Sequence, residues 1–86
     1  MRLVVLYRQN SEMASKTEEF MREFSRRSAH TIEVLDPDTR EGDSLARVYD
    51  IVSYPAILVL TDDGQPLKSW EGDMLPLMDE VAAYTQ

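Results

Sequence analysis

Ser11 is the side chain whose type and position are best suited to chemistry. It follows an apolar run at residues 3–7 and precedes a stretch of helical periodicity. A hydroxyl at a helix N-terminus could stabilise a thiolate there, helped by the free N–H groups and the helix dipole. A serine nucleophile also needs a base, and the single histidine, His30, follows the far end of that helix. The alternative interpretation is that Ser11 caps the helix, because serine is a preferred N-cap residue.

Carboxylates gather in one loop, at Asp36, Asp38, Glu41 and Asp43. Their spacing resembles a calcium-binding loop, but Glu41 stands where such a loop requires glycine. A solvated loop with a helix cap explains the same residues. A lone histidine is not a metal site, and no pair of carboxylates is placed for acid–base catalysis. We therefore expect no catalytic residue, no metal site and no cofactor.

Length and composition restrict the function further. Eighty-six residues predict a single domain spanning 1–86. The absence of cysteine excludes disulfides, thiolate metal sites and cysteine nucleophiles. A net charge of -7 argues against nucleic-acid partners and against docking on anionic membranes. No apolar run approaches the roughly 18 residues of a membrane span, and no leader is recognisable, so a cytoplasmic location is expected.

Hydrophobic periodicity predicts the elements of the first half. Residues 3–7 form an apolar run typical of a buried central strand. A helix follows, with an inward face of Met13, Thr17, Phe20, Met21 and Phe24. Residues 31–35 alternate as in an edge strand, with Ile32 and Val34 facing the core.

The second half predicts four more elements. A helix is expected from Asp43 or Ser44, with an inward face of Leu45, Val48, Tyr49 and Val52. Residues 56–60 are apolar on both faces, and residues 61–65 form a hairpin turn around Asp63-Gly64 before a strand at 67–71. A last helix is expected to begin at Gly72-Asp73, with Met74, Leu77, Met78 and Val81 on one face and Pro76 in its first turn. Trp70 is expected to cover the sheet beneath a helix, although an exposed anchor is the alternative.

These elements define an α/β fold of order β-α-β-α-β-β-α. The first crossover must be right-handed, which makes the first two strands parallel neighbours. The hairpin pairs the last two strands, and the two doubly apolar strands belong at the centre. We therefore expect a four-stranded mixed sheet of order 2-1-3-4, with three helices distributed over both faces.

The middle of the chain resembles the thioredoxin-like superfamily. Residues 34–60 contain a strand that ends in acidic residues, a short helix that ends near Tyr49, and Pro55 before the next strand. The hairpin at 61–64 and Trp70-Glu71-Gly72 also resemble that family, and the likeness extends over nearly the whole chain. The resemblance implies a thioredoxin-like fold with a cis Tyr54-Pro55 bond.

The resemblance fails at the family's redox motif. The Cys-x-x-Cys of thioredoxins and glutaredoxins aligns with Ser11-Glu12-Met13-Ala14, so dithiol exchange is chemically impossible in this chain. Ser11 stands in place of the nucleophilic cysteine and Ala14 in place of the resolving one. An engineered replacement of two cysteines would leave the same sequence.

The resulting hypothesis is a redox-inactive protein- or peptide-binding module that pairs an extended ligand beside Tyr54 by strand addition. Its groove is expected to comprise Ser11, Glu12, Met13, Ala14, Tyr54, Pro55, Gly72 and Asp73. One alternative is a glutathione- or thiol-handling transferase that uses Ser11, although Glu12 and the acidic chain oppose an anionic ligand. The other is a structural subunit that contributes an edge strand to an assembly.

Overall fold

The seven elements follow one another in the predicted order in a computed structural model, which describes residues 1–85, with Thr85 described by its backbone alone. They are β1 Arg2–Leu6, α1 Ala14–Arg27, β2 Ile32–Leu35, α2 Arg40–Val48, β3 Ala56–Leu60, β4 Pro66–Glu71 and α3 Met78–Thr85. The four strands begin and end within one residue of their predicted bounds. Within residues 1–85, no helix is both long enough and apolar enough to cross a membrane.

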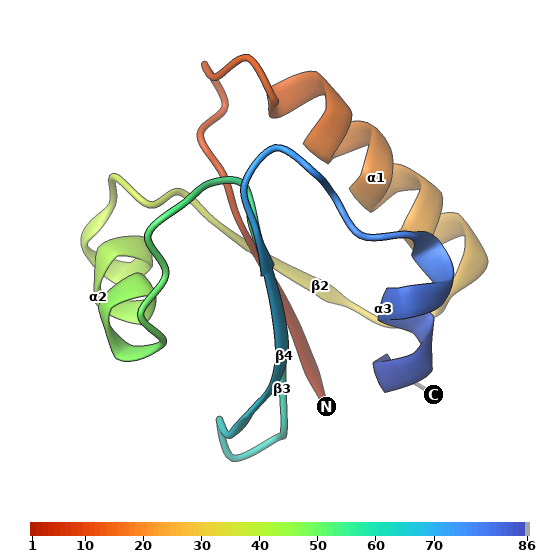
Figure 1. Cartoon of the computed structure of the whole chain (residues 1–86). Coiled ribbons are helices and arrows are strands. Elements are labelled where there is room, and N and C mark those ends of the chain that lie inside the picture. Colours follow the sequence, from red (N-terminus) through yellow and green to blue (C-terminus); the bar gives the residue numbers. More distant parts are fainter. Residues whose placement is uncertain (86) are drawn as a thin grey trace.

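The sheet has the predicted mixed topology, with order β2-β1-β3-β4. β1 runs parallel to β2 and antiparallel to β3, and β3 pairs with β4 through the Gly64 turn. α1 and α3 cover one face of the sheet and α2 covers the other (Figure 1). The α/β prediction with three helices is therefore confirmed.

The central strands are buried because they supply both cores. On β1, Leu3 and Val5 pack toward α1, which contributes Phe20 and Phe24. The residues between them, Val4 and Leu6, pack on the other face with Ala46 and Ile51. This alternation follows from the two-residue period of a strand and explains why residues 3–7 are apolar throughout. Trp70 lies over the first of these cores, edge-on to Tyr84 of α3 with ring centroids 5.9 Å apart, so its expected covering role is correct.

Val34 departs from its predicted inward position. It pairs with Val5 in register, yet its exposed fraction is 48%. β2 is the outer strand of the sheet, so a side chain there can share the inner face of its neighbour without being covered.

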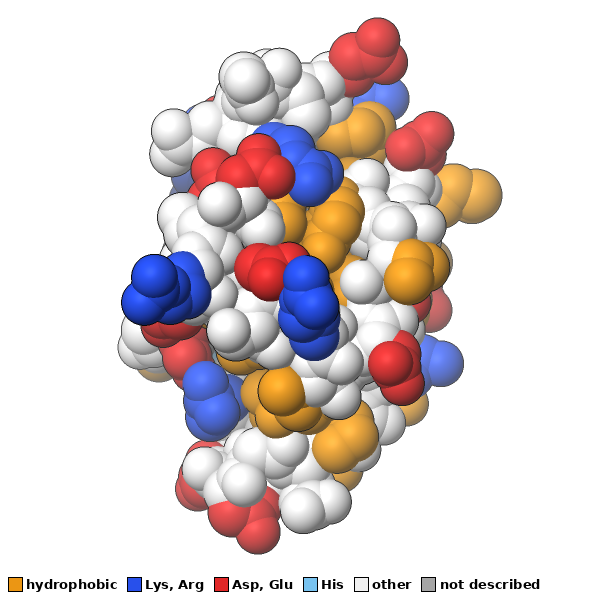
Figure 2. Space-filling view, turned by 90° about the vertical axis from the view of Figure 1, so that its left-hand side faces the viewer, with side chains coloured by type: hydrophobic (Ala, Val, Ile, Leu, Met, Phe, Trp, Pro, Cys, Tyr) orange, Lys and Arg blue, Asp and Glu red, His pale blue; other side chains and the backbone are white. Residues whose placement is uncertain are grey.

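The inward face of α2 differs from the prediction. The helix begins at Arg40, because Thr39 caps it by accepting a hydrogen bond at 3.1 Å from the Gly42 N–H. Ala46 packs on the sheet and Gly42 packs against the backbone of Asp36 and Pro37. Val48 and Val52, by contrast, are 71% and 83% exposed. Hydrophobic side chains are visible between charged ones on the α2 side of the molecule (Figure 2). The predicted inward face is therefore correct for Leu45 and Tyr49, which pack against the core, and wrong for Val48 and Val52. α2 approaches the chain through its smallest residues, which leaves those two valines uncovered.

The start of α3 was also predicted too early. Residues 72–77 form an irregular segment, and the helix begins at Met78, where Glu80 Oε1 accepts a hydrogen bond at 2.9 Å from the Leu77 N–H. This bond is half of a capping box. The buried side chain of Pro76 anchors this segment. Met74 and Leu77, which were predicted to face inward, are 88% and 71% exposed.

Candidate functional site

A groove lies at the C-terminal end of β1, where three segments far apart in the sequence meet. They are the turn before α1, the residues before β3 and the segment after β4 (Figure 1). The groove has a volume of about 230 Å³ and is lined by Arg8, Ser11, Glu12, Met13, Tyr54, Pro55 and Asp73. Six of the eight residues predicted for the binding groove therefore come together in space.

The other two predicted residues support the groove without lining it. Ala14, the first residue of α1, is 7% exposed and belongs to the core beneath. Gly72 has a φ of +93°, and its N–H donates to the carbonyl oxygen of Pro55 at 3.0 Å. A positive φ suits glycine, which has no Cβ to clash with the backbone. Gly72 thus ties the segment after β4 to the proline at the base of the groove.

Ser11 is not the N-cap of α1, contrary to the capping interpretation. The N-cap is Met13, and no side chain in the described part of the chain caps this end of the helix. The Ser11 hydroxyl instead donates to the carbonyl oxygen of Arg8 at 2.7 Å, and its backbone N–H donates to the same oxygen at 3.2 Å. The Ala14 N–H in turn donates to the Ser11 carbonyl at 3.2 Å. Ser11 therefore closes the turn that leads into α1.

Arg8 is held in place by a partner that sequence reasoning did not assign. Its Nε lies 3.1 and 3.0 Å from the two carboxylate oxygens of Asp38, and its guanidinium carbon lies 4.9 Å from the centroid of the Tyr54 ring. The hydrogen bond to Asp38 raises the pKa of Arg8. Stacking of a guanidinium on an aromatic ring is attractive, so Arg8 fixes the orientation of Tyr54.

Glu71 is the second supporting residue that sequence reasoning missed. Its Oε1 accepts hydrogen bonds from the backbone N–H groups of Val52 and Ser53, at 2.8 and 3.1 Å. These bonds join the end of β4 to the segment that precedes Tyr54. Nothing in the sequence distinguishes Glu71 from any other strand-end carboxylate, because its partners lie about twenty residues away.

The backbone of Tyr54 offers hydrogen-bonding groups at the groove. The Tyr54–Pro55 peptide bond is cis, and Tyr54 lies just before β3. Within residues 1–85, the structure records no hydrogen bond for the N–H or the carbonyl of Tyr54. Backbone polar groups are strong hydrogen-bonding groups that are almost always paired when buried. An extended chain placed beside Tyr54 can supply these bonds.

The groove carries excess negative charge. Glu12 and Asp73 are exposed and line it from different segments. The only cation among the lining residues is Arg8, and Asp38 offsets its charge. The arrangement therefore favours a neutral or cationic ligand over an anionic one.

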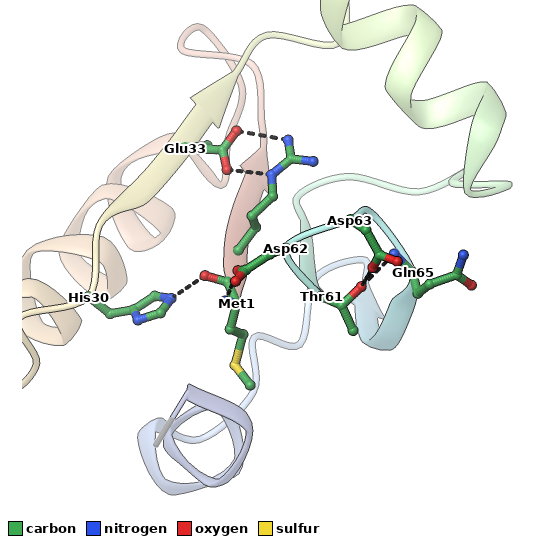
Figure 3. Close-up of polar contacts among 8 residues, drawn as sticks. Met1, His30, Glu33, Thr61, Asp62, Asp63 and Gln65 are labelled. Atoms are coloured by element: carbon green, nitrogen blue, oxygen red, sulfur yellow. Dashed lines mark hydrogen bonds and ion pairs between the residues drawn. The ribbon is translucent and has the colours of Figure 1, made fainter.

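His30 lies at the opposite end of the molecule from Ser11. Its Nε2 is 3.0 Å from the carbonyl oxygen of Met1, in a network that also joins the N-terminal amine to Asp62 and Arg2 to Glu33 (Figure 3). α1 separates the two ends, and its fourteen residues span about 21 Å. His30 cannot serve as a base for Ser11. Within the described residues no group of three histidine, aspartate or glutamate side chains could hold a metal ion.

A larger hollow of about 470 Å³ lies between the C-terminal end of α1 and the start of α3. Two of its polar side chains, Arg27 and Ser28, already have partners within the protein. Arg27 Nε pairs with Glu23 at 3.0 Å, and the Ser28 hydroxyl accepts a hydrogen bond from the His30 N–H at 3.1 Å. The groove at Tyr54 is the stronger candidate because three segments far apart in the sequence meet there, at the end of the sheet where β1 ends and β3 begins.

No protein-family model matches this chain, and a search of the curated proteins finds no match.

Proposed function

We propose that this chain is a redox-inactive binding module of the thioredoxin-like type, which holds an extended segment of a partner protein or peptide in the groove at Tyr54. The observation that carries the proposal is the Tyr54 backbone, whose N–H and carbonyl have no recorded partner within residues 1–85. Strand addition uses such groups, since main-chain hydrogen bonds supply affinity without demanding one particular sequence.

The surroundings of Tyr54 support an extended ligand. The Arg8 guanidinium braces its ring, Glu71 holds the two residues before it, and Gly72 holds the residue after it. A preorganised site loses less entropy on binding than one that must be ordered. The volume of about 230 Å³ is below the roughly 300–1,000 Å³ of pockets that enclose drug-sized molecules. An open groove of this size suits a side chain or two of a longer ligand.

The structure supports a glutathione-handling transferase that uses Ser11 less well than it supports a peptide-binding module. Its hydroxyl hydrogen is directed at the Arg8 carbonyl, and Glu12 and Asp73 would repel the carboxylates of glutathione. A structural subunit that offers only an edge strand does not require a groove at all.

A selection from random linear peptides displayed on phage tests the proposal. We expect the enriched peptides, once synthesised, to shift the amide resonances of Ser11, Met13, Tyr54 and Asp73. In an extended ligand only every second residue directs its N–H and carbonyl at a given partner strand. N-methylation at one set of alternate residues should therefore abolish binding, and methylation at the intervening set should leave it intact.

Two results would contradict the proposal. One is a failure of the selection to enrich any peptide that shifts the groove resonances. The other is binding that survives N-methylation of both alternate sets. Saturable shifts of the same resonances by glutathione would instead favour the transferase.

A further inference from the structure

Two carboxylates, those of Glu12 and Asp73, line the groove. Glu12 belongs to the turn before α1 and Asp73 to the segment after β4, so they approach the same groove from two separate parts of the chain. Arg8 contributes little free positive charge, because Asp38 lies 3.0 Å from its Nε. The whole chain carries a net charge of -7, which adds to the attraction for cations.

One apolar side chain lines the groove, and two exposed ones lie close in sequence to its lining residues. Met74 and Val52 are 88% and 83% exposed, the highest values among the large hydrophobic side chains that the structure describes. Met74 follows Asp73 directly, and Val52 precedes Tyr54 by two residues. Met13 lines the groove and is half-buried. Methionine is flexible and polarisable, so it adapts to ligands of different shape.

We infer that the groove selects extended peptide segments that carry lysine or arginine. This inference rests on the proposed function and adds the chemistry of the partner. Successive side chains of an extended segment point to opposite sides. Alternate side chains of the ligand can therefore enter the groove, where a basic one meets Glu12 and Asp73, while the residues between them point away from it. Acidic segments are repelled by the same carboxylates.

Three matched peptides test the inference, with acetyl and amide ends and the sequences Val-Lys-Leu-Lys-Val, Val-Gln-Leu-Gln-Val and Val-Glu-Leu-Glu-Val. Affinity and binding position are measured by NMR titration of the groove amides in low salt. We expect the lysine peptide to bind most tightly and the glutamate peptide least. Salt at about 1 M, where the screening length falls to about 3 Å, should remove most of the difference between them.

The double variant Glu12→Gln, Asp73→Asn isolates the carboxylates. Its expected effect is a loss of about five-fold in affinity for the lysine peptide, as for two solvent-exposed ion pairs, with little change for the glutamine peptide. The double variant Glu19→Gln, Glu41→Gln removes the same charge at exposed positions that do not line the groove. It should bind the lysine peptide nearly as the wild type does, because distant charges are screened.

The outcomes separate the two proposals. Equal binding of all three peptides at the groove would overturn the inference and leave the binding function standing. Equal losses in the two double variants would also overturn it, because net charge alone would then explain the preference. If none of the three peptides shifts the groove amides, the inference is wrong. The binding function itself is then decided by the random library.

Discussion

Gly42 is the position where a single methyl group should do the most damage. It is buried in α2, and a Cβ built there would overlap the carbonyl oxygen of Asp36, lying 2.7 Å from the carbonyl carbon and 3.1 Å from Pro37 Cα. All of these are backbone atoms, which cannot rotate away as a side chain can. We therefore expect Gly42→Ala to destabilise the protein, although the same change in an ordinary helix stabilises it by about 0.5–1 kcal/mol.

The size of the loss follows from what must move. Relief of the overlap requires α2 to withdraw from the turn at Asp36, where Thr39 donates from its N–H at 3.1 Å and from its hydroxyl at 2.6 Å to the Asp36 carbonyl. Overpacking costs roughly 1–3 kcal/mol and each weakened hydrogen bond about 1 kcal/mol. After subtraction of the helix-propensity gain, the expected loss is about 3 kcal/mol. For a domain of this size, that lowers the Tm by about 12–24 °C.

Urea unfolding followed by the fluorescence of Trp70 measures this loss. The matched control is Ser44→Ala, an exposed position of the same helix, which should raise the free energy of unfolding by a few tenths of a kcal/mol. A Gly42→Ala variant as stable as the wild type would refute the reasoning, because α2 could then shift without cost.

Three further predictions concern single contacts. The pKa of Glu33 is lowered by its hydrogen bonds to Arg2, so the wild type should be more stable than Glu33→Gln at neutral pH and lose this advantage as acid protonates Glu33. Urea unfolding midpoints of the two proteins, measured against pH, check this. A difference between the midpoints that does not change with pH would contradict it. The pKa of Tyr7 is raised by burial and by its hydrogen bond to Glu18, so the stability of the wild type should fall as the pH rises above about 10. Tyr7→Phe should lose stability less steeply over the same range. If urea unfolding shows the same dependence of stability on alkaline pH in both proteins, Tyr7 is not the cause. Glu71→Ala should speed hydrogen exchange of the Val52 and Ser53 amides several-fold, because it removes the oxygen that accepts their hydrogen bonds. Glu71→Gln keeps an acceptor oxygen and should speed it less. Exchange in Glu71→Ala as slow as in the wild type would show that the carboxylate does not hold the loop.

Six of the seven residues that line the groove were predicted from the sequence, with the help of the resemblance to the thioredoxin-like superfamily. Ser11, Glu12 and Met13 follow a buried strand and precede a helix, and the position of Pro55 before the apolar run 56–60 placed Tyr54 at the start of a central strand. Once the strand order is known, both segments must meet at one end of the sheet. The supporting contacts were not predictable, since Asp38 and Glu71 reach their partners across about 30 and 19 residues. A carboxylate in a loop looks the same in sequence whether or not it has such a partner.

The sequence by itself determined the order of the elements and the topology of the sheet. Apolar runs, the Asp63-Gly64 turn and the right-handed crossover depend on local chemistry and on a general rule of chain geometry, so they can be read without knowing the neighbours. The face that α1 buries was also predictable, whereas the tertiary structure alone decided which face of α2 is buried and where α3 begins. Val48 and Met74 are apolar at helical spacing, yet both are exposed. Val48 is exposed because α2 contacts the chain through Gly42, and Met74 is exposed because α3 begins only after the buried Pro76. Periodicity shows that a segment has an apolar face, but the space left by the packed backbone selects the residues that occupy the core.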